Sequence, residues 1–171
     1  KSQSENMRVT LVDTGLNTMT AGRLKRVQHY VGEEAFMLTY GDGLCDIDLK
    51  ELLKFHEQHG KTATVTAIQP AGRFGVLRSL EDGQVTAFSE KPKGDGNWIN
   101  GGYFVLNPSV FNYLEGDVDE VMWEQDPMNE LVADKQIMAF KHNGFWKAMD
   151  TLRDKNELES LWNSDEAKWK R

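Results

Sequence analysis

The chain has 171 residues, of which 39% are hydrophobic and 27% are charged. This composition is typical of a globular domain and excludes a disordered chain, which is poorer in apolar residues. The length predicts one domain over residues 1–171. The net charge of −7, without a basic stripe, argues against nucleic acid and anionic membrane surfaces as partners.

Cysteine content and hydropathy bear on the compartment. Cys45 is the single cysteine, so an internal disulfide and a cysteine-only metal site are excluded, which fits a reducing compartment. No apolar run approaches the roughly 20 residues that span a bilayer, and residues 1–6 show no apolar segment of a signal peptide. We therefore expect a cytoplasmic protein without a membrane partner.

Strands and helices alternate in the first part of the chain. Apolar patterning predicts strands at 8–12, 34–40 and 62–68 and helices at 20–31 and 48–59. Asp48 suits the first position of its helix, and Gly60 suits its end. The continuous apolar run before Gly41 is typical of a strand buried on both faces, as in a parallel sheet. This order predicts an α/β fold with a doubly wound, mainly parallel, Rossmann-like sheet.

The second part of the chain predicts antiparallel additions to this sheet. Glu81-Asp82-Gly83 separates two β-rich runs and predicts a hairpin. Further strands are expected at 74–80, 85–90, 102–106, 137–141 and 145–149, short helices at 108–114 and 128–133, and a closing amphipathic helix at 151–162.

Two aspartates are predicted at the ends of strands. Asp42, within Tyr40-Gly41-Asp42-Gly43, follows a buried strand at the carboxyl edge, where open α/β sheets bind ligands. Asp150 ends a later strand just before a helix. Two such carboxylates could hold one Mg²⁺ ion against a phosphate chain. A tight turn explains Asp42 equally well, and a favourable charge in the first turn of a helix explains Asp150.

Three further segments carry groups suited to phosphates and sugars. Lysines in Glu90-Lys91-Pro92-Lys93-Gly94 are common phosphate ligands, and the glutamate can accept hydrogen bonds from sugar hydroxyls. Asn100-Gly101-Gly102 offers an amide and an open backbone. Arg23-Leu24-Lys25-Arg26 begins a helix and could bind phosphate. A solvated loop, a turn and a solvated helix face are the alternative interpretations.

Taken in this order, the motifs resemble those of the sugar-phosphate nucleotidylyltransferases, and most closely the glucose-1-phosphate cytidylyltransferase branch. The resemblance runs from about Val9 to Trp169. The motifs that carry it are Val12-Asp13-Thr14-Gly15, Met19-Thr20-Ala21-Gly22-Arg23-Leu24-Lys25-Arg26, Tyr40-Gly41-Asp42-Gly43, Gly72-Arg73-Phe74-Gly75, Glu90-Lys91-Pro92-Lys93-Gly94, Asn100-Gly101-Gly102-Tyr103-Phe104-Val105, and Phe145-Trp146 with Met149-Asp150-Thr151.

The resemblance implies an activity and a set of residues. The implied reaction joins CTP and α-D-glucose 1-phosphate to give CDP-glucose and pyrophosphate, with Mg²⁺ as cofactor. The implied catalytic residues are Asp42, Asp150 and Lys91, of which the two aspartates hold the metal. The implied substrate-binding residues are Thr18, Arg23, Gly41, Gly75, Glu90, Lys91, Asn100 and Gly101. We also expect a homo-oligomer, and the family suggests a role in deoxysugar and surface-polysaccharide synthesis.

One part of the family pattern is not in this sequence. The family begins with a strand and a Gly-Gly-x-Gly-Thr-Arg loop, whereas this sequence begins at Lys1. We therefore expect the chain to be the C-terminal two-thirds of the family's fold. Two alternatives stay open. One is a metal-dependent glycosyltransferase with Asp46-Ile47-Asp48 as its metal motif, and the other is a non-catalytic, truncated relative that binds sugar phosphate.

Overall fold

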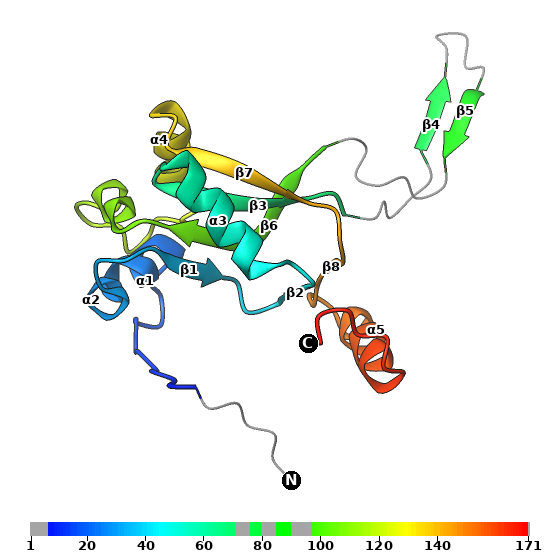
Figure 1. The fold of residues 1–171 in the computed structure, drawn as a ribbon, viewed down its shortest axis with the longest axis horizontal. Coiled ribbons are helices and arrows are strands. Elements are labelled where there is room, and N and C mark those ends of the chain that lie inside the picture. The colour runs from blue at the N-terminus through cyan, green and yellow to red at the C-terminus, as the bar shows by residue number, and fades with distance from the viewer. Residues whose placement is uncertain (1–6, 71–75, 80–84, 90–96, 171) are drawn as a thin grey trace.

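The computed structural model describes residues 7–70, 76–79, 85–89 and 97–170, and Figure 1 shows its ribbon. Its central feature is a four-stranded sheet in the order β1-β6-β3-β7. β6 runs antiparallel to β1 and β3, whereas β7 runs parallel to β3. Three of the four strands therefore point the same way, which confirms the predicted α/β class. The strands are β1 (Phe36–Thr39), β3 (Ala63–Ile68), β6 (Ile99–Leu106) and β7 (Ile137–His142).

Helices cover both faces of this sheet (Figure 1). They are α1 (Thr20–Arg26), α2 (Gln28–Val31), α3 (Leu49–His59), the 3₁₀ helix η2 (Pro108–Tyr113) and α4 (Asp126–Ala133). The last helix, α5 (Leu152–Asn163), lies apart from this sheet near the C-terminus (Figure 1). Because strand side chains alternate between faces, Phe104 and Leu106 pack with α1, η2 and α4, while Val105 packs with Leu52 of α3. None of the helices in the described ranges is long and apolar enough to cross a membrane.

The best local signals in the sequence are confirmed in α3. The Asp48 carboxylate accepts hydrogen bonds from the backbone N–H groups of Lys50, at 2.9 Å, and Glu51, at 3.2 Å. These contacts satisfy two of the amides that a helix leaves unpaired at its start. Gly60 ends the helix at φ 61°, in the left-handed region that favours glycine. The helix predicted at 20–31 also forms, although it divides at Val27 into α1 and α2.

Two short ribbons stand beside the main sheet. β4 (Val76–Ser79) pairs antiparallel with β5 (Val85–Ser89), as the predicted hairpin requires, while the turn at 81–83 lies outside the described residues. β2 (Gly43–Cys45) pairs antiparallel with β8 (Trp146–Ala148). The pairing of β2 was not predicted, because three residues carry too little pattern. This second ribbon places the ends of two distant segments side by side.

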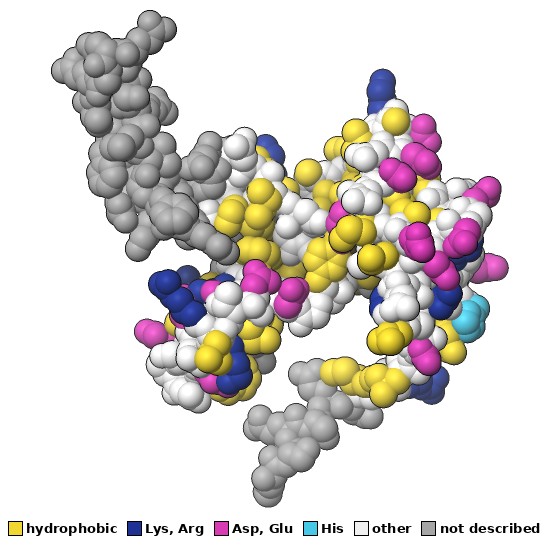
Figure 2. All heavy atoms as spheres, turned by 180° about the vertical axis from the view of Figure 1, so that it is seen from behind, with side chains coloured by type: hydrophobic (Ala, Val, Ile, Leu, Met, Phe, Trp, Pro, Cys, Tyr) yellow, Lys and Arg dark blue, Asp and Glu magenta, His cyan; other side chains and the backbone are white. Residues whose placement is uncertain are grey.

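The strand predicted at 8–12 is wrong. Residues 7–15 have no regular structure, and the side chains of Val9 and Leu11 are 69% and 92% exposed. β-propensity reflects the fit of a side chain to a pleated, half-buried surface, and no strand among the described residues pairs with this segment. An apolar run therefore remains at the surface. Hydrophobic side chains also reach the surface on the face that Figure 2 shows.

Candidate functional site

The β2–β8 ribbon brings the two predicted metal-binding aspartates to one place. Gly43 stands opposite Ala148 in the ladder. One step further, the backbone N–H of Met149 donates to the backbone carbonyl of Asp42 at 2.8 Å. Asp150 is the next residue along the chain. Asp42 and Asp150 are far apart in sequence, yet Asp150 directly follows the residue that pairs with Asp42.

Asp42 and Asp150 carry the type of group that Mg²⁺ takes from proteins. Asp42 and Asp150 are both exposed, and carboxylates are the hard oxygen ligands that the ion takes from proteins, commonly one or two at a time with phosphate and water completing the shell. The described residues contain no group of three or more His, Cys, Asp or Glu that could hold a metal. A site that uses this pair would therefore depend on substrate oxygens for its remaining ligands.

The glycine pair of Asn100-Gly101-Gly102 forms a bulge inside β6, not a loop before it as the sequence suggested. Val65 stands opposite Phe104, yet Ala67 stands opposite Asn100. Three residues of β6 therefore lie opposite the single residue Thr66 of β3. Extra residues of this kind bend a strand locally and redirect its side chains, and such bulges are frequent near active sites.

Both glycines of the bulge are required by their surroundings. Gly102 has φ 77°, and a Cβ added there would lie 2.7 Å from Cδ2 of Tyr40. A Cβ on Gly101 would lie 3.0 Å from the backbone oxygen of Thr66. Gly41 differs, because a Cβ there would meet nothing within 4 Å. The open surroundings of Gly41 agree with the prediction that a ligand approaches this turn.

Two aromatic donors tie the bulge to the aspartate-bearing turn. Tyr103 donates from Oη to the backbone oxygen of Gly43 at 2.6 Å. Trp146 of β8 donates from Nε1 to the backbone oxygen of Gly101 at 2.7 Å. Burial is the largest cause that raises the pKa of Tyr103, so its hydroxyl keeps its proton at neutral pH. The two hydrogen bonds join β6, β2 and β8 around Gly43.

Asn100 also begins a chain of hydrogen bonds that reaches α1. Its Nδ2 donates to Oη of Tyr40 at 3.3 Å, and Tyr40 in turn donates to Oε1 of Glu124. Oε2 of Glu124 accepts from the hydroxyl of Thr20 at 3.1 Å. That hydroxyl accepts from the backbone N–H of Trp123 at 2.7 Å. The chain connects the bulge with the first residue of α1.

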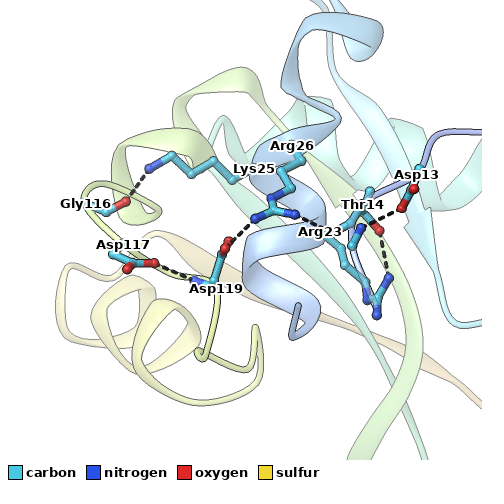
Figure 3. A network of polar contacts seen from close by, with 9 residues as sticks. Asp13, Thr14, Arg23, Lys25, Arg26, Gly116, Asp117 and Asp119 are labelled. Carbon is cyan, nitrogen blue, oxygen red and sulfur yellow. Dashed lines mark hydrogen bonds and ion pairs between the residues drawn. The ribbon is translucent and has the colours of Figure 1, made fainter. Parts of the chain in front are cut away.

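Thr18 lies just before α1, and Arg23 lies on this helix, in the network that Figure 3 shows. Arg23 donates from Nη1 to Oγ1 of Thr14 at 2.7 Å and from Nη2 to the oxygen of Leu16 at 3.2 Å. Thr18 is buried, and its methyl group packs so closely on Gly22 that a Cβ there would come within 2.6 Å. Both of these predicted substrate-binding residues therefore hold the chain that leads into α1.

The other cations of α1 also bind neighbouring loops (Figure 3). Lys25 donates to the backbone oxygen of Gly116 at 2.6 Å. Arg26 donates to the backbone oxygen of Thr14 at 2.8 Å and forms an ion pair with Asp119. The basic residues Lys25 and Arg26 therefore have structural contacts, which hold α1 against residues 116–119.

The predicted site residues fall into two groups in the structure. Asp42, Asp150, Gly41, Asn100 and Gly101 are brought together by β2, β6 and β8. Thr18 and Arg23 form the second group at α1, and the chain through Glu124 is the described connection between the two. The remaining three predicted residues, Gly75, Glu90 and Lys91, lie outside the described residues.

The metal motif of the glycosyltransferase alternative has structural roles instead. Asp48 caps α3. The carboxylate of Asp46 accepts from the backbone N–H of Phe145 at 2.7 Å and lies 3.0 Å from Nε2 of His142. Both side chains are therefore explained by the fold, and the geometry does not favour this alternative.

Four residues at the site were missed by reasoning from the sequence. Tyr40, Tyr103 and Trp146 all lie inside the motifs of the resemblance, so a ring with a polar donor near glycines was a usable signal. Glu124 had no such signal, since it belongs to no recognised motif and contacts residues 84 and 104 positions away.

Comparison with known proteins agrees with this geometry. A sequence model described as nucleotidyl transferase matches residues 2–163. Similar proteins include the glucose-1-phosphate cytidylyltransferases of Salmonella typhi and Salmonella typhimurium, each 56% identical over 167 residues. The match covers 97% of this chain but 64% of each relative, so the chain spans less than two thirds of their length.

Solved structures share the fold. A UDP-glucose pyrophosphorylase complexed with UDP-glucose superposes with a TM-score of 0.63 at 17% identity, over 89% of this chain and 64% of that one. At that identity the likeness concerns the fold alone. Together with the family match over residues 2–163, it leads to one conclusion: the chain belongs to the nucleotidyl transferase family.

Proposed function

We propose that the protein containing this chain transfers a cytidylyl group from CTP to α-D-glucose 1-phosphate, giving CDP-glucose and pyrophosphate. The observation that carries the proposal is the hydrogen bond between Met149 and Asp42, which sets Asp42 beside Asp150. The likeness to the two Salmonella enzymes supports the choice of substrates. Substrates of this family carry several phosphate groups, and a pair of neighbouring carboxylates can bind these groups through a metal ion.

The proposed reaction is an in-line displacement at the α-phosphorus of CTP. A phosphate oxygen of glucose 1-phosphate forms the new P–O bond, and the bond to the β-phosphate breaks with its electron pair leaving on pyrophosphate. The attacking oxygen is already ionised at neutral pH, so no general base is required. Both reactants are anions, so catalysis depends on positioning and on neutralising charge.

Each predicted residue has a role in this scheme. Asp42 and Asp150 would hold Mg²⁺, which when bound neutralises charge on phosphate oxygens. Lys91 anchors the attacking phosphate, because ammonium groups are common phosphate ligands. Glu90, Gly75, Asn100 and Gly101 would bind the sugar side, and the list of binding residues is completed by Gly41 at the turn and by Thr18 and Arg23 at α1.

Product analysis of the natural-length protein tests the proposal. The protein is incubated with CTP, glucose 1-phosphate and MgCl₂, and CDP-glucose and pyrophosphate are measured, with UTP, dTTP, GTP and ATP as competing donors. CDP-glucose as the main product supports the proposal. Consumption of a nucleotide sugar with release of a nucleoside diphosphate would instead identify a glycosyltransferase. Binding of glucose 1-phosphate without CTP, seen by calorimetry, would identify the non-catalytic alternative.

We further propose that the protein is a cytoplasmic homo-oligomer. The exposed ring of Trp162, at 50% accessibility on α5, supports an oligomer contact, because exposed aromatic side chains are enriched at interfaces. Light scattering of the natural-length protein would show a mass that is a multiple of the protomer. A monomer at micromolar concentration would contradict this part of the proposal.

A further inference from the structure

The ring of Tyr40 is held firmly at the centre of the candidate site. Tyr40 is the residue before Gly41-Asp42, and its backbone N–H donates to the backbone oxygen of Gly102 at 3.1 Å. Its ring packs edge-on against Phe104, with centroids 5.8 Å apart. On its other side the ring fills the space that a side chain on residue 102 would need. The position of the hydroxyl is therefore fixed by the backbone and by packing.

The hydrogen bonds around Tyr40 have one consistent direction. Oδ1 of Asn100 accepts from the backbone N–H of Gly102 at 2.8 Å, so Nδ2 is the end that faces Tyr40. An amide nitrogen can only donate, hence the Tyr40 oxygen accepts, and the hydroxyl proton goes to the carboxylate of Glu124.

This arrangement leaves Asn100 with one free N–H and one free lone pair for a bound molecule. The bond to Tyr40 uses one of the two Nδ2 hydrogens, and the bond from Gly102 uses one lone pair of Oδ1. Asn100 is exposed, so the second hydrogen is available to a bound molecule. We propose that Tyr40, oriented by Glu124, is a positioning residue that fixes the amide of Asn100 for hydrogen bonding to the sugar phosphate.

The inference rests on the proposed function, because Asn100 binds glucose 1-phosphate only within that scheme. It also assigns a purpose to Glu124. One oxygen of this carboxylate orients Tyr40, and the other accepts from Thr20 at the start of α1. The Glu124 side chain thus links the hydrogen bonds of Asn100 to the helix that carries Arg23, another predicted substrate-binding residue.

Tyr40→Phe is the first test, because it removes the hydroxyl and keeps the packed ring. In the natural-length protein we expect the KM for glucose 1-phosphate to rise about fivefold, the scale of one hydrogen bond. The kcat and the KM for CTP should stay within about twofold. Tyr113→Phe is the matched control, since it removes another tyrosine–carboxylate bond, to Asp134 at 3.0 Å, far from the site. It should leave both KM values unchanged.

A double-mutant cycle separates positioning from a general structural effect. In an Asn100→Ala background, Tyr40→Phe should cause no further rise in the KM for glucose 1-phosphate, because the residue through which it acts is gone. An equal rise in both backgrounds would overturn the inference. Glu124→Gln keeps an acceptor for Tyr40 and should raise the KM less than Glu124→Ala. This pair also serves as the test if Tyr40→Phe fails to fold.

The outcomes distinguish the inference from the function on which it rests. If the unsubstituted protein forms no CDP-glucose, the proposed function fails and the inference fails with it. If CDP-glucose forms and Tyr40→Phe leaves the KM for glucose 1-phosphate unchanged, the inference alone is overturned.

Discussion

The backbone N–H of Met149 lies 2.8 Å from the backbone oxygen of Asp42, and this contact continues the β2–β8 ladder by one step. It is the feature that makes Asp42 and Asp150 neighbours. Because the contact is between backbone atoms, the side chain of either aspartate can be changed without breaking it. The metal assignment can therefore be tested separately from the fold.

Replacement of either aspartate by asparagine should disable the enzyme without unfolding it. For Asp42→Asn or Asp150→Asn in the natural-length protein we expect turnover to fall by roughly 10²-fold or more, the scale of losing one preorganised electrostatic group. Both residues are exposed, so the thermal midpoint should change little. Turnover is measured at saturating substrates over a range of MgCl₂ concentrations, and Mn²⁺ binding is followed by electron paramagnetic resonance.

The matched control for the aspartates is Asp126→Asn, an exposed carboxylate in the first turn of α4. It should retain normal turnover and Mn²⁺ binding. Near-normal turnover of the Asp42 or Asp150 variant at saturating Mg²⁺ would contradict the metal assignment.

Lys91→Ala should weaken the binding of the sugar phosphate. The ammonium group is expected to neutralise the attacking phosphate, so the KM for glucose 1-phosphate should rise at least about tenfold, as charge-assisted hydrogen bonds are stronger than neutral ones. The KM for CTP should change less. Steady-state kinetics on the natural-length protein measures both, with Lys93→Ala in the same segment as the comparison. An unchanged KM for glucose 1-phosphate would count against the assignment.

Gly102→Ala should destabilise the fold more than an alanine at another glycine of similar backbone angle. Gly116 has φ 73° with nothing within 4 Å of an added Cβ, whereas Gly102 has φ 77° and Tyr40 in the way. Gly116→Ala should therefore lower the free energy of unfolding by about 1–2 kcal/mol through backbone strain alone. Gly102→Ala should cost about 1–3 kcal/mol more through overpacking. Urea denaturation compares the two, and equal losses would mean that Tyr40 moves aside freely.

Acidification should weaken the fold through His59. Its Nδ1 accepts from the backbone N–H of Lys61 at 2.9 Å, and Nε2 lies 2.7 Å from the hydroxyl of Thr64. Burial, then the charges of His56 and Lys61, hold the pKa of His59 below its ordinary value. The unfolded chain therefore binds a proton more readily, and stability is lost as the pH falls below the ordinary histidine range of about 6.5.

Urea denaturation at about pH 7.5 and about pH 5.5 measures the histidine effect. His59→Gln should reduce the loss of stability between these two values. His29→Gln, at an exposed position in α2, is the control and should retain the full loss. An identical pH response of the His59 variant and the unsubstituted chain would refute the prediction.

Both helices and strands were predicted correctly, for different reasons. α3 has its N-cap at Asp48, its apolar face and its terminal Gly60 within thirteen consecutive residues, so its causes are local. The strands predicted at 62–68 and 137–141 form as β3 and β7, which pair with each other. The strand predicted at 8–12 failed because a strand needs a hydrogen-bonded neighbour, and a short β-rich run does not supply one.

Part of the candidate site could be predicted from the sequence. Both aspartates were predicted at strand ends, and the backbone contact between Met149 and Asp42 does bring the two segments together, although β8 pairs with β2 in a separate ribbon and not in the main sheet. Their joint role in metal binding stays a prediction. The role of Glu124 could not be predicted, since its contacts with Tyr40 and Thr20 join segments that only tertiary packing brings together. The bulge at Gly101-Gly102 was taken for the segment before a strand, because glycines are frequent in turns as well as in bulges.

The bulge in β6 has a consequence for the sugar that the proposed function requires. Asn100 stands opposite Ala67 of β3, and the backbone oxygen of Gly101 accepts from Trp146, whereas the ladder with β1 reaches only as far as Tyr103. Asn100 and Gly101 are therefore held by strand pairing and by a side-chain hydrogen bond, and do not swing as a free loop would. In the proposed function a sugar must match this fixed frame, so a change of sugar preference requires new side chains around β6. Exchange of surface loops would leave this part of the recognition untouched.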